Sequence, residues 1–198
     1  AGAKATPVVV VLGDSLTAGY ELAPDEALPV QLEKALAQRG VAARLVNAGV
    51  SGDTTANGLE RFEESVRDAA PDFVVIALGT NDHILRLPSR HAKQNLSEMI
   101  FKTRNEGAGV ALIGLKPRWK WRFMRPVDMA YASVYRSLSR SHDVPLFDDI
   151  LRNVRMDSRL TLDGLHPNAD GVRVMAENIA EFLAPHLSAL SHTNRAPI

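Results

Sequence analysis

Short apolar runs alternate along the chain with longer stretches in which apolar residues recur every three or four positions. The apolar runs cover residues 8–12, 41–47, 73–78, 110–115 and 144–147, and the periodic stretches cover residues 24–39, 59–66, 89–106, 129–140 and 168–187. The runs are typical of buried strands, and the stretches are typical of amphipathic helices. Because a helix between two strands returns the chain to the same end of the sheet, such strands pair in parallel. The sequence therefore predicts an α/β fold in three layers, in which helices cover both faces of a five-stranded parallel sheet.

The size and charge of the chain limit its organisation and its partners. Its 198 residues suffice for one well-cored domain, residues 1–198, and flexible tails are expected at residues 1–6 and 191–198. Its 23 basic residues balance its 23 acidic residues, so no overall field attracts nucleic acid and no nucleic-acid partner is expected. No apolar run approaches the about 20 residues of a membrane-spanning helix, so stable membrane insertion is not expected.

Two further features concern the compartment. The chain has no cysteine, which excludes disulfides, thiolate metal sites and cysteine nucleophiles but leaves the redox compartment open. The chain begins at Ala1 rather than at methionine, which favours a periplasmic or secreted protein whose signal peptide has been removed. Trimming at that point would give the same start, so a cytoplasmic location stays open.

Ser15 follows the first apolar run directly, in the turn Gly13-Asp14-Ser15. The carboxyl ends of parallel strands are where open α/β sheets place their ligand sites. A serine hydroxyl becomes a useful nucleophile when a histidine takes its proton and a carboxylate orients that histidine. Asp163 and His166 supply these two groups, and a single turn of backbone can place them side by side. The structural alternative is that Ser15 only caps the N-terminus of a helix.

Two other turns follow apolar runs and carry small polar residues, one over residues 47–53 and one over residues 77–82. They can add the backbone N–H of Gly52 and the side-chain amide of Asn81 to the same rim. Four separate blocks would then converge on one site for acyl transfer. Asn81 can equally serve the backbone of its own turn, and Ser51 is a rival nucleophile.

The blocks Gly13-Asp14-Ser15, Gly52, Gly79-Thr80-Asn81-Asp82 and Asp163-Gly164-Leu165-His166-Pro167 resemble those of the SGNH, or GDSL-type, hydrolase superfamily. The pattern is most similar to the bacterial arylesterase, acyl-thioesterase and lysophospholipase group, and it extends over residues 8–187. The resemblance implies a flavodoxin-like strand order, which the apolar pattern alone does not determine.

The resemblance implies that Ser15, Asp163 and His166 form a catalytic triad. The N–H groups of Ser15 and Gly52 and the amide of Asn81 would then form the oxyanion hole. Such a mechanism needs no metal and no organic cofactor. A metal site at Asp163 and His166 is the alternative, and it would need further ligands at a compatible spacing.

Three further residues are candidates for the substrate site. Trp119 and Trp121 lie among basic residues in the stretch 116–126, which follows the fourth apolar run. This stretch can form a pocket wall or lid, a contact between subunits of a homo-oligomer, a lipid-binding surface or, least expected, a nucleic-acid site. His83 follows Asn81 closely and can line the cleft or occupy a solvated loop.

The expected function is a serine esterase that hydrolyses short-chain acyl or aryl esters through an acyl-enzyme. The expected partner is a small-molecule ester or thioester. Acyl-thioesterase or lysophospholipase activity and carbohydrate deacetylation remain alternatives that use the same site. A binding module that has kept the fold and lost catalysis is the alternative outside enzymes.

Overall fold

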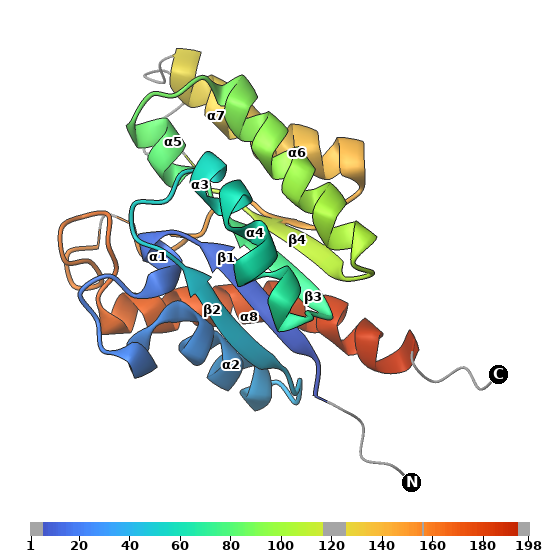
Figure 1. The fold of residues 1–198 in the computed structure, drawn as a ribbon. Coiled ribbons are helices and arrows are strands. Elements are labelled where there is room, and N and C mark those ends of the chain that lie inside the picture. The colour runs from blue at the N-terminus through green and yellow to red at the C-terminus, as the bar shows by residue number, and fades with distance from the viewer. Residues whose placement is uncertain (1–5, 117–125, 156, 194–198) are drawn as a thin grey trace, which may run out of the picture.

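The structure, a computed structural model, describes residues 6–116, 126–155 and 157–193. Five strands form one parallel sheet (Figure 1): β1 (Val8–Gly13), β2 (Arg44–Gly49), β3 (Phe73–Ala77), β4 (Gly109–Ile113) and β5 (Leu146–Phe147). Their order is β2-β1-β3-β4-β5. This order confirms the flavodoxin-like arrangement that the family resemblance implies.

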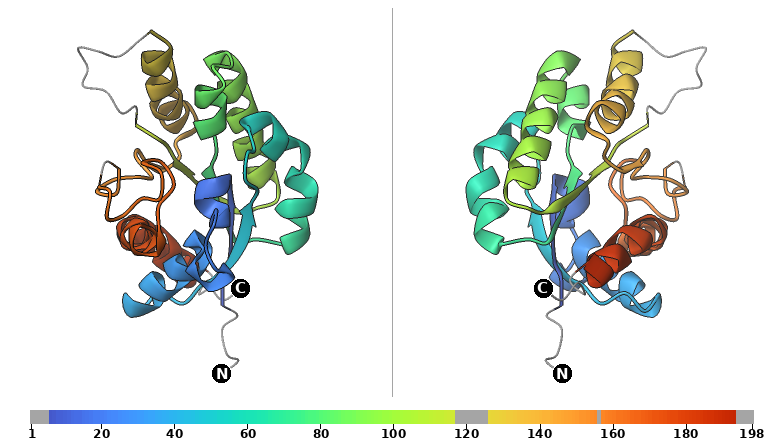
Figure 2. Two further views of the ribbon diagram at one scale, coloured as in Figure 1. Left: turned by 90° about the vertical axis from the view of Figure 1, so that its left-hand side faces the viewer. Right: turned by 90° about the vertical axis from the view of Figure 1, so that its right-hand side faces the viewer.

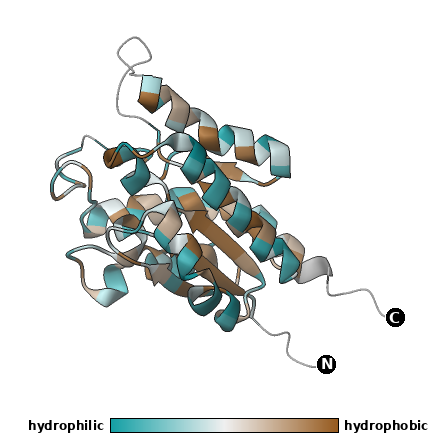
Figure 3. Cartoon of the chain, turned by 45° about the horizontal axis from the view of Figure 1, so that its top comes forward, coloured by the Kyte–Doolittle hydropathy of each residue, from teal (hydrophilic) through white to brown (hydrophobic). Residues whose placement is uncertain are grey.

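Helices cover both faces of this sheet, as predicted (Figure 2). The α-helices are α1 (Ser15–Ala18), α2 (Leu28–Gln38), α3 (Thr55–Glu60), α4 (Phe62–Ser65), α5 (Thr80–Ile84), α6 (Ser89–Asn105), α7 (Pro126–His142) and α8 (Ala169–Thr193). Helices α2 and α8 pack on one face, and α4, α6 and α7 pack on the other. Hydrophobic residues are concentrated in the strands (Figure 3). The strands β1, β3 and β4 are buried on both faces, whereas the edge strand β2 exposes Arg44 and Asn47.

The first strand illustrates how this packing arises from the sequence. Val9 and Val11 point into the core beneath α2 and α8, whereas Val10 and Leu12 point into the core beneath α4, α6 and α7. All four side chains are fully buried. A run in which apolar residues do not alternate with polar ones therefore forms a central strand. The residues that follow this strand lie at the carboxyl edge of the sheet.

Two predicted helices have different boundaries in the structure. The stretch 24–39 divides into a 3-10 helix (Pro24–Glu26) and α2, because Pro29 is well accommodated only in the first turn of an α-helix. The stretch around residues 59–66 divides into α3 and α4, followed by a 3-10 helix (Arg67–Ala69). Arg61 lies at the break between α3 and α4, and its side chain reaches back to the ends of the strands.

The last helix is longer than predicted. Helix α8 continues to Thr193, so residues 191–193 are helical where a tail was expected. Pro185 does not end the helix, because Leu183 and Leu187 on either side of it are buried against the sheet. Within residues 6–116, 126–155 and 157–193, no helix is both long and apolar enough to cross a membrane.

Candidate active site

Ser15 lies where β1 ends and α1 begins. The Asp14 carboxylate caps α1, since its Oδ1 accepts a hydrogen bond of 3.0 Å from the backbone N–H of Leu16. Asp14 itself is buried, and Ser15 is partly exposed at the sheet edge. The capping role that the sequence allowed for Ser15 thus belongs to Asp14, which leaves the Ser15 hydroxyl available.

The structure brings Ser15, His166 and Asp163 together in one chain of hydrogen bonds. Ser15 Oγ lies 3.1 Å from His166 Nε2, although the two residues are 151 positions apart in the sequence. His166 Nδ1 lies 2.6 Å from Asp163 Oδ2. An ionised carboxylate only accepts hydrogen bonds, so Nδ1 carries the hydrogen and Nε2 can accept the proton of Ser15.

Asp163 is held in the ionised form that this arrangement requires. The hydrogen bond from the His166 ring, together with the backbone N–H groups of His166 and Leu165, lowers the pKa of Asp163 to about 2. The carboxylate is half-exposed, so hydrogen bonds rather than burial account for this pKa. Asp163 therefore stays charged at neutral and weakly acidic pH.

The loop before α8 fixes the geometry of the His166 ring. Thr161 and Pro167 form an isolated antiparallel bridge, and the N–H of Leu162 donates to the carbonyl of His166 at 2.8 Å. The ring of Tyr20 packs against the imidazole with a centroid separation of 4.4 Å. This loop (orange) lies beside α1 (blue) in Figure 1, so the two ends of the chain meet at one edge of the sheet.

Two of the three predicted oxyanion donors, Gly52 and Asn81, belong to one hydrogen-bonded unit. Asn81 Nδ2 donates to the carbonyl of Asp53 at 2.8 Å, and Gly52 is the residue just before Asp53. Gly52 has a φ of 88°, a conformation that favours glycine, and within the described ranges its N–H donates no hydrogen bond. The N–H of Val50 donates to the carbonyl of Gly13 at 3.1 Å, which joins this loop to the Ser15 turn.

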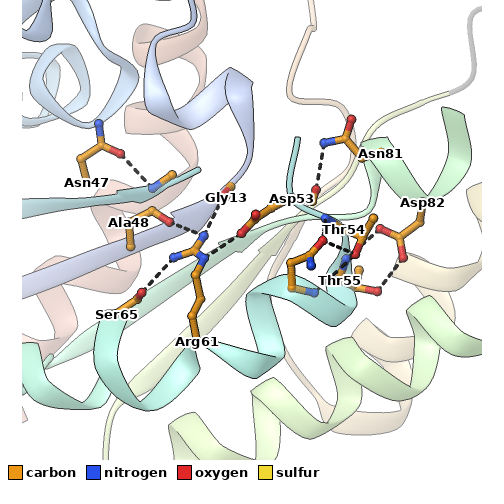
Figure 4. A network of polar contacts seen from close by, with 12 residues as sticks. Gly13, Asn47, Ala48, Asp53, Thr54, Thr55, Arg61, Ser65, Asn81 and Asp82 are labelled. Atoms are coloured by element: carbon orange, nitrogen blue, oxygen red, sulfur yellow. Dashed lines mark hydrogen bonds and ion pairs between the residues drawn. The ribbon is translucent and has the colours of Figure 1, made fainter. Parts of the chain in front are cut away.

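Residues to which the sequence assigned no role hold this unit in place (Figure 4). Asp82 is buried and accepts hydrogen bonds from the backbone N–H and the hydroxyl of Thr55, at 2.8 and 2.6 Å. Asn95 Nδ2 donates to the same hydroxyl at 3.0 Å. Arg61 contacts Asp53 on the other side of the loop. Asp82 was visible in the Gly79-Thr80-Asn81-Asp82 block, whereas no sequence pattern marked Arg61.

Asp14 is the most perturbed carboxyl group near Ser15. Burial raises its pKa to about 6, and hydrogen bonds together with the charge of His166 offset only part of that effect. Its Oδ2 has no hydrogen-bond partner among the described residues, and the same holds for the hydroxyl of Thr17. An uncharged Asp14 is therefore favoured over an ionised one below about pH 6.

The other predicted site residues have different outcomes. His83 lies in α5, where Nε2 is 2.7 Å from Oδ1 of the buried Asp128, so the solvated loop position is wrong. Its contact with substrate stays a prediction. Trp119 and Trp121 lie outside the described residues. Ser51 is exposed and has no histidine partner in the described part of the chain.

The sequence is similar to those of a known protein family and of several named proteins. A model of the GDSL-like Lipase/Acylhydrolase family matches residues 11–174. The chain is 34% identical over 190 residues to an arylesterase from Vibrio mimicus, across 94% of this chain and 93% of the relative. It is 33% identical over 186 residues to esterase TesA from Pseudomonas aeruginosa, across 92% and 90%. It is 29% identical over 184 residues to thioesterase 1/protease 1/lysophospholipase L1 from Escherichia coli, across 92% and 86%.

Solved structures share the fold over almost the whole chain. A crystal structure of TesA matches with a TM-score of 0.82 and 32% identity, across 90% of this chain and 98% of the other. AlinE4, an SGNH-hydrolase family esterase, matches with a TM-score of 0.75 and 30% identity, across 98% and 100%. The chain therefore belongs to the GDSL-like lipase/acylhydrolase family, which confirms the resemblance in its sequence blocks.

Proposed function

We propose that this protein is a serine carboxylic ester hydrolase that cleaves short-chain acyl or aryl esters through an acyl-enzyme on Ser15. The observation that carries the proposal is the chain of hydrogen bonds from Ser15 Oγ through His166 to Asp163. A hydroxyl, an imidazole and a carboxylate in this order are the parts that activate a serine nucleophile.

Each group has one role in the proposed reaction. His166 Nε2 takes the proton of Ser15 as Oγ attacks the ester carbonyl, and the ionised Asp163 stabilises the imidazolium that forms. His166 then donates this proton to the leaving alcohol, and the C–O bond of the ester breaks. Water, activated by the same imidazole, attacks the acyl-enzyme, releases the acid and restores the Ser15 hydroxyl.

The oxyanion of each tetrahedral intermediate needs preorganised donors. The N–H of Gly52 and the second N–H of the Asn81 amide are the donors we assign, together with the N–H of Ser15. Because one Asn81 N–H is already bound to the Asp53 carbonyl, the orientation of the amide is fixed before substrate arrives. A fixed donor costs no reorganisation during the reaction.

The surface around the triad favours an apolar acyl or aryl group. Several large apolar side chains are exposed in the segments that follow the strands, namely Tyr20, Val50 and Leu162 in loops and Ile84 and Leu85 at the end of α5. Tyr20 contacts the His166 ring, and Leu162 precedes Asp163. Such side chains can pack against a substrate without supplying charge. The names of the relatives, an arylesterase and an esterase, support the same substrate class.

Hydrolysis of p-nitrophenyl esters with acyl chains of two to about sixteen carbons tests the proposal. We expect a turnover that Ser15→Ala abolishes and that Ser51→Ala, the matched control, leaves intact. The highest kcat/KM is expected for chains of two to about four carbons. A Ser15→Ala variant as active as the wild type would refute the mechanism.

Acyl-thioester hydrolysis is the second candidate, because a relative carries the name thioesterase 1/protease 1/lysophospholipase L1. Thioesters pass through the same acyl-enzyme, so the difference lies in the binding of the leaving group. A kcat/KM higher for an eight-carbon or longer acyl-coenzyme A than for p-nitrophenyl acetate would favour this candidate.

A further inference from the structure

The Arg61 side chain donates hydrogen bonds to four residues in and around the Gly52 loop (Figure 4). Its Nε donates to Asp53 Oδ2 at 2.7 Å, and its Nη1 donates to the hydroxyl of Ser65 at 3.0 Å. Its Nη2 donates to the backbone carbonyls of Gly13 at 3.2 Å and Ala48 at 2.9 Å. Only a planar group with several N–H donors can satisfy all of these acceptors together.

Three of these four acceptors lie in segments that carry a functional group, whereas Ser65 lies in α4. Gly13 ends β1 two residues before Ser15, and Ala48 lies at the end of β2, which leads into the Gly52 loop. Asp53 follows Gly52, and its carbonyl accepts the hydrogen bond from Asn81. One guanidinium group therefore joins the serine turn to both of the assigned oxyanion donors outside it.

Burial makes this contact different from an ordinary surface ion pair. The side chain of Arg61 is only 18% exposed and that of Asp53 only 12%. If Arg61 is replaced, water can reach this site only poorly. The carboxylate of Asp53 and the carbonyls of Gly13 and Ala48 would then lose a hydrogen-bond donor that water does not replace. The loop would be expected to shift until these acceptors find other partners.

We propose that Arg61 is a positioning residue that holds Gly52 and Asn81 at the distance from Ser15 that the oxyanion requires. This inference rests on the proposed ester hydrolysis and extends it to a residue that touches neither the substrate nor the triad. A donor displaced by about 1 Å can cost about a hundredfold in rate. The loss falls on turnover, because the oxyanion exists only after the ester carbonyl has been attacked.

The first experiment compares Arg61→Met and the more conservative Arg61→Lys with a matched control. Arg39 is the control, since it also pairs with a carboxylate, that of Glu177 at 2.6 Å, and donates to the Ala35 carbonyl, but it joins α2 to α8. With p-nitrophenyl acetate we expect Arg61→Met to lower kcat about a hundredfold with KM within about twofold. Arg61→Lys should lose less, and Arg39→Met should keep its kcat.

The second experiment is a double-mutant cycle between Arg61→Lys and Asn81→Ala, measured on variants whose circular dichroism is that of the wild type. If Arg61 acts through the oxyanion donors, its substitution lowers kcat less in the Asn81→Ala background than in the wild type. The acid side of the pH–rate profile should stay unchanged, because the triad is intact. Strictly additive losses, or a loss of stability with normal kcat, would overturn the inference.

The two proposals fail in different ways. If the wild type hydrolyses no ester, or if Ser15→Ala hydrolyses esters as well as the wild type does, the proposed function fails. If Ser15→Ala is inactive and Asn81→Ala is impaired while Arg61→Lys and Arg61→Met keep the wild-type kcat, only the positioning role fails.

Discussion

Asp14→Asn should make the protein gain stability relative to the wild type as the pH rises through the weakly acidic range. Burial raises the pKa of Asp14 from 3.8 to about 6, so the folded protein binds this proton more tightly than the unfolded chain does. The contribution of Asp14 to the stability of the wild type therefore falls as the pH rises between these two values. Asparagine does not titrate, so the variant lacks this pH-dependent contribution to stability.

The size of the effect follows from the pKa difference. Each pKa unit corresponds to about 1.4 kcal/mol, so a shift of about two units gives about 3 kcal/mol in total. About 2 kcal/mol of this change in the free energy of unfolding occurs between about pH 4 and about pH 7. Asparagine keeps the oxygen that caps α1, and any constant cost of burying its amide is the same at every pH.

Urea unfolding of both proteins at several values between about pH 4 and about pH 7 measures this difference. Asp157→Asn is the control, because its hydrogen bonds with Arg159 lower the pKa of Asp157 to about 2, outside the range measured. The control should differ from the wild type by a constant amount. An Asp14→Asn difference that is also constant, or that falls with rising pH, would show that Asp14 is ionised in the folded protein.

Three further predictions concern the site. Asn81→Ala should keep the fold and lower kcat by about a hundred- to a thousandfold, and unchanged turnover in a folded variant would remove Asn81 from the mechanism. Asp163 should add no step to the acid side of the pH–rate profile down to about pH 4, because its pKa of about 2 keeps the carboxylate ionised there; a step that belongs to Asp163 at its ordinary pKa of 3.8 would contradict this. Gly79→Ala should destabilise the fold by at least about 1–2 kcal/mol in urea unfolding, because Gly79 has a φ of 117° and the added methyl group would overlap the Tyr135 hydroxyl. A variant as stable as the wild type would show that the turn can relax.

The sequence predicts the sheet well because its central strands, β1, β3 and β4, are buried on both faces. A run such as Val8 to Leu12 has no polar residue to suggest an exposed face, and strands of this kind occur almost only between layers of helices. Asp163 and His166 were predictable as a pair because they are close in the sequence. Their partner Ser15 was predictable from its place at the end of a strand.

The sequence does not predict the features that depend on distant backbone groups. In the sequence, Arg61 resembles a solvent-exposed charged residue between Leu59 and Phe62. Two of its acceptors are backbone carbonyls of β1 and β2. Every residue has such a carbonyl, so the residue types do not indicate these contacts. Helix α2 begins at Leu28, later than predicted, because Pro29 fits only in the first turn of an α-helix. The spacing of apolar residues does not indicate this boundary. The pairing of His83 with Asp128 likewise depends on how α5 and α7 meet.

The separation of 151 positions between Ser15 and His166 has a consequence for synthesis. A nascent chain that has left the ribosome only as far as β5 already contains the serine turn, yet it lacks the base that would activate the hydroxyl. Premature termination upstream of the last helix therefore yields inert fragments, and the appearance of esterase activity during translation would report that the final segment has docked.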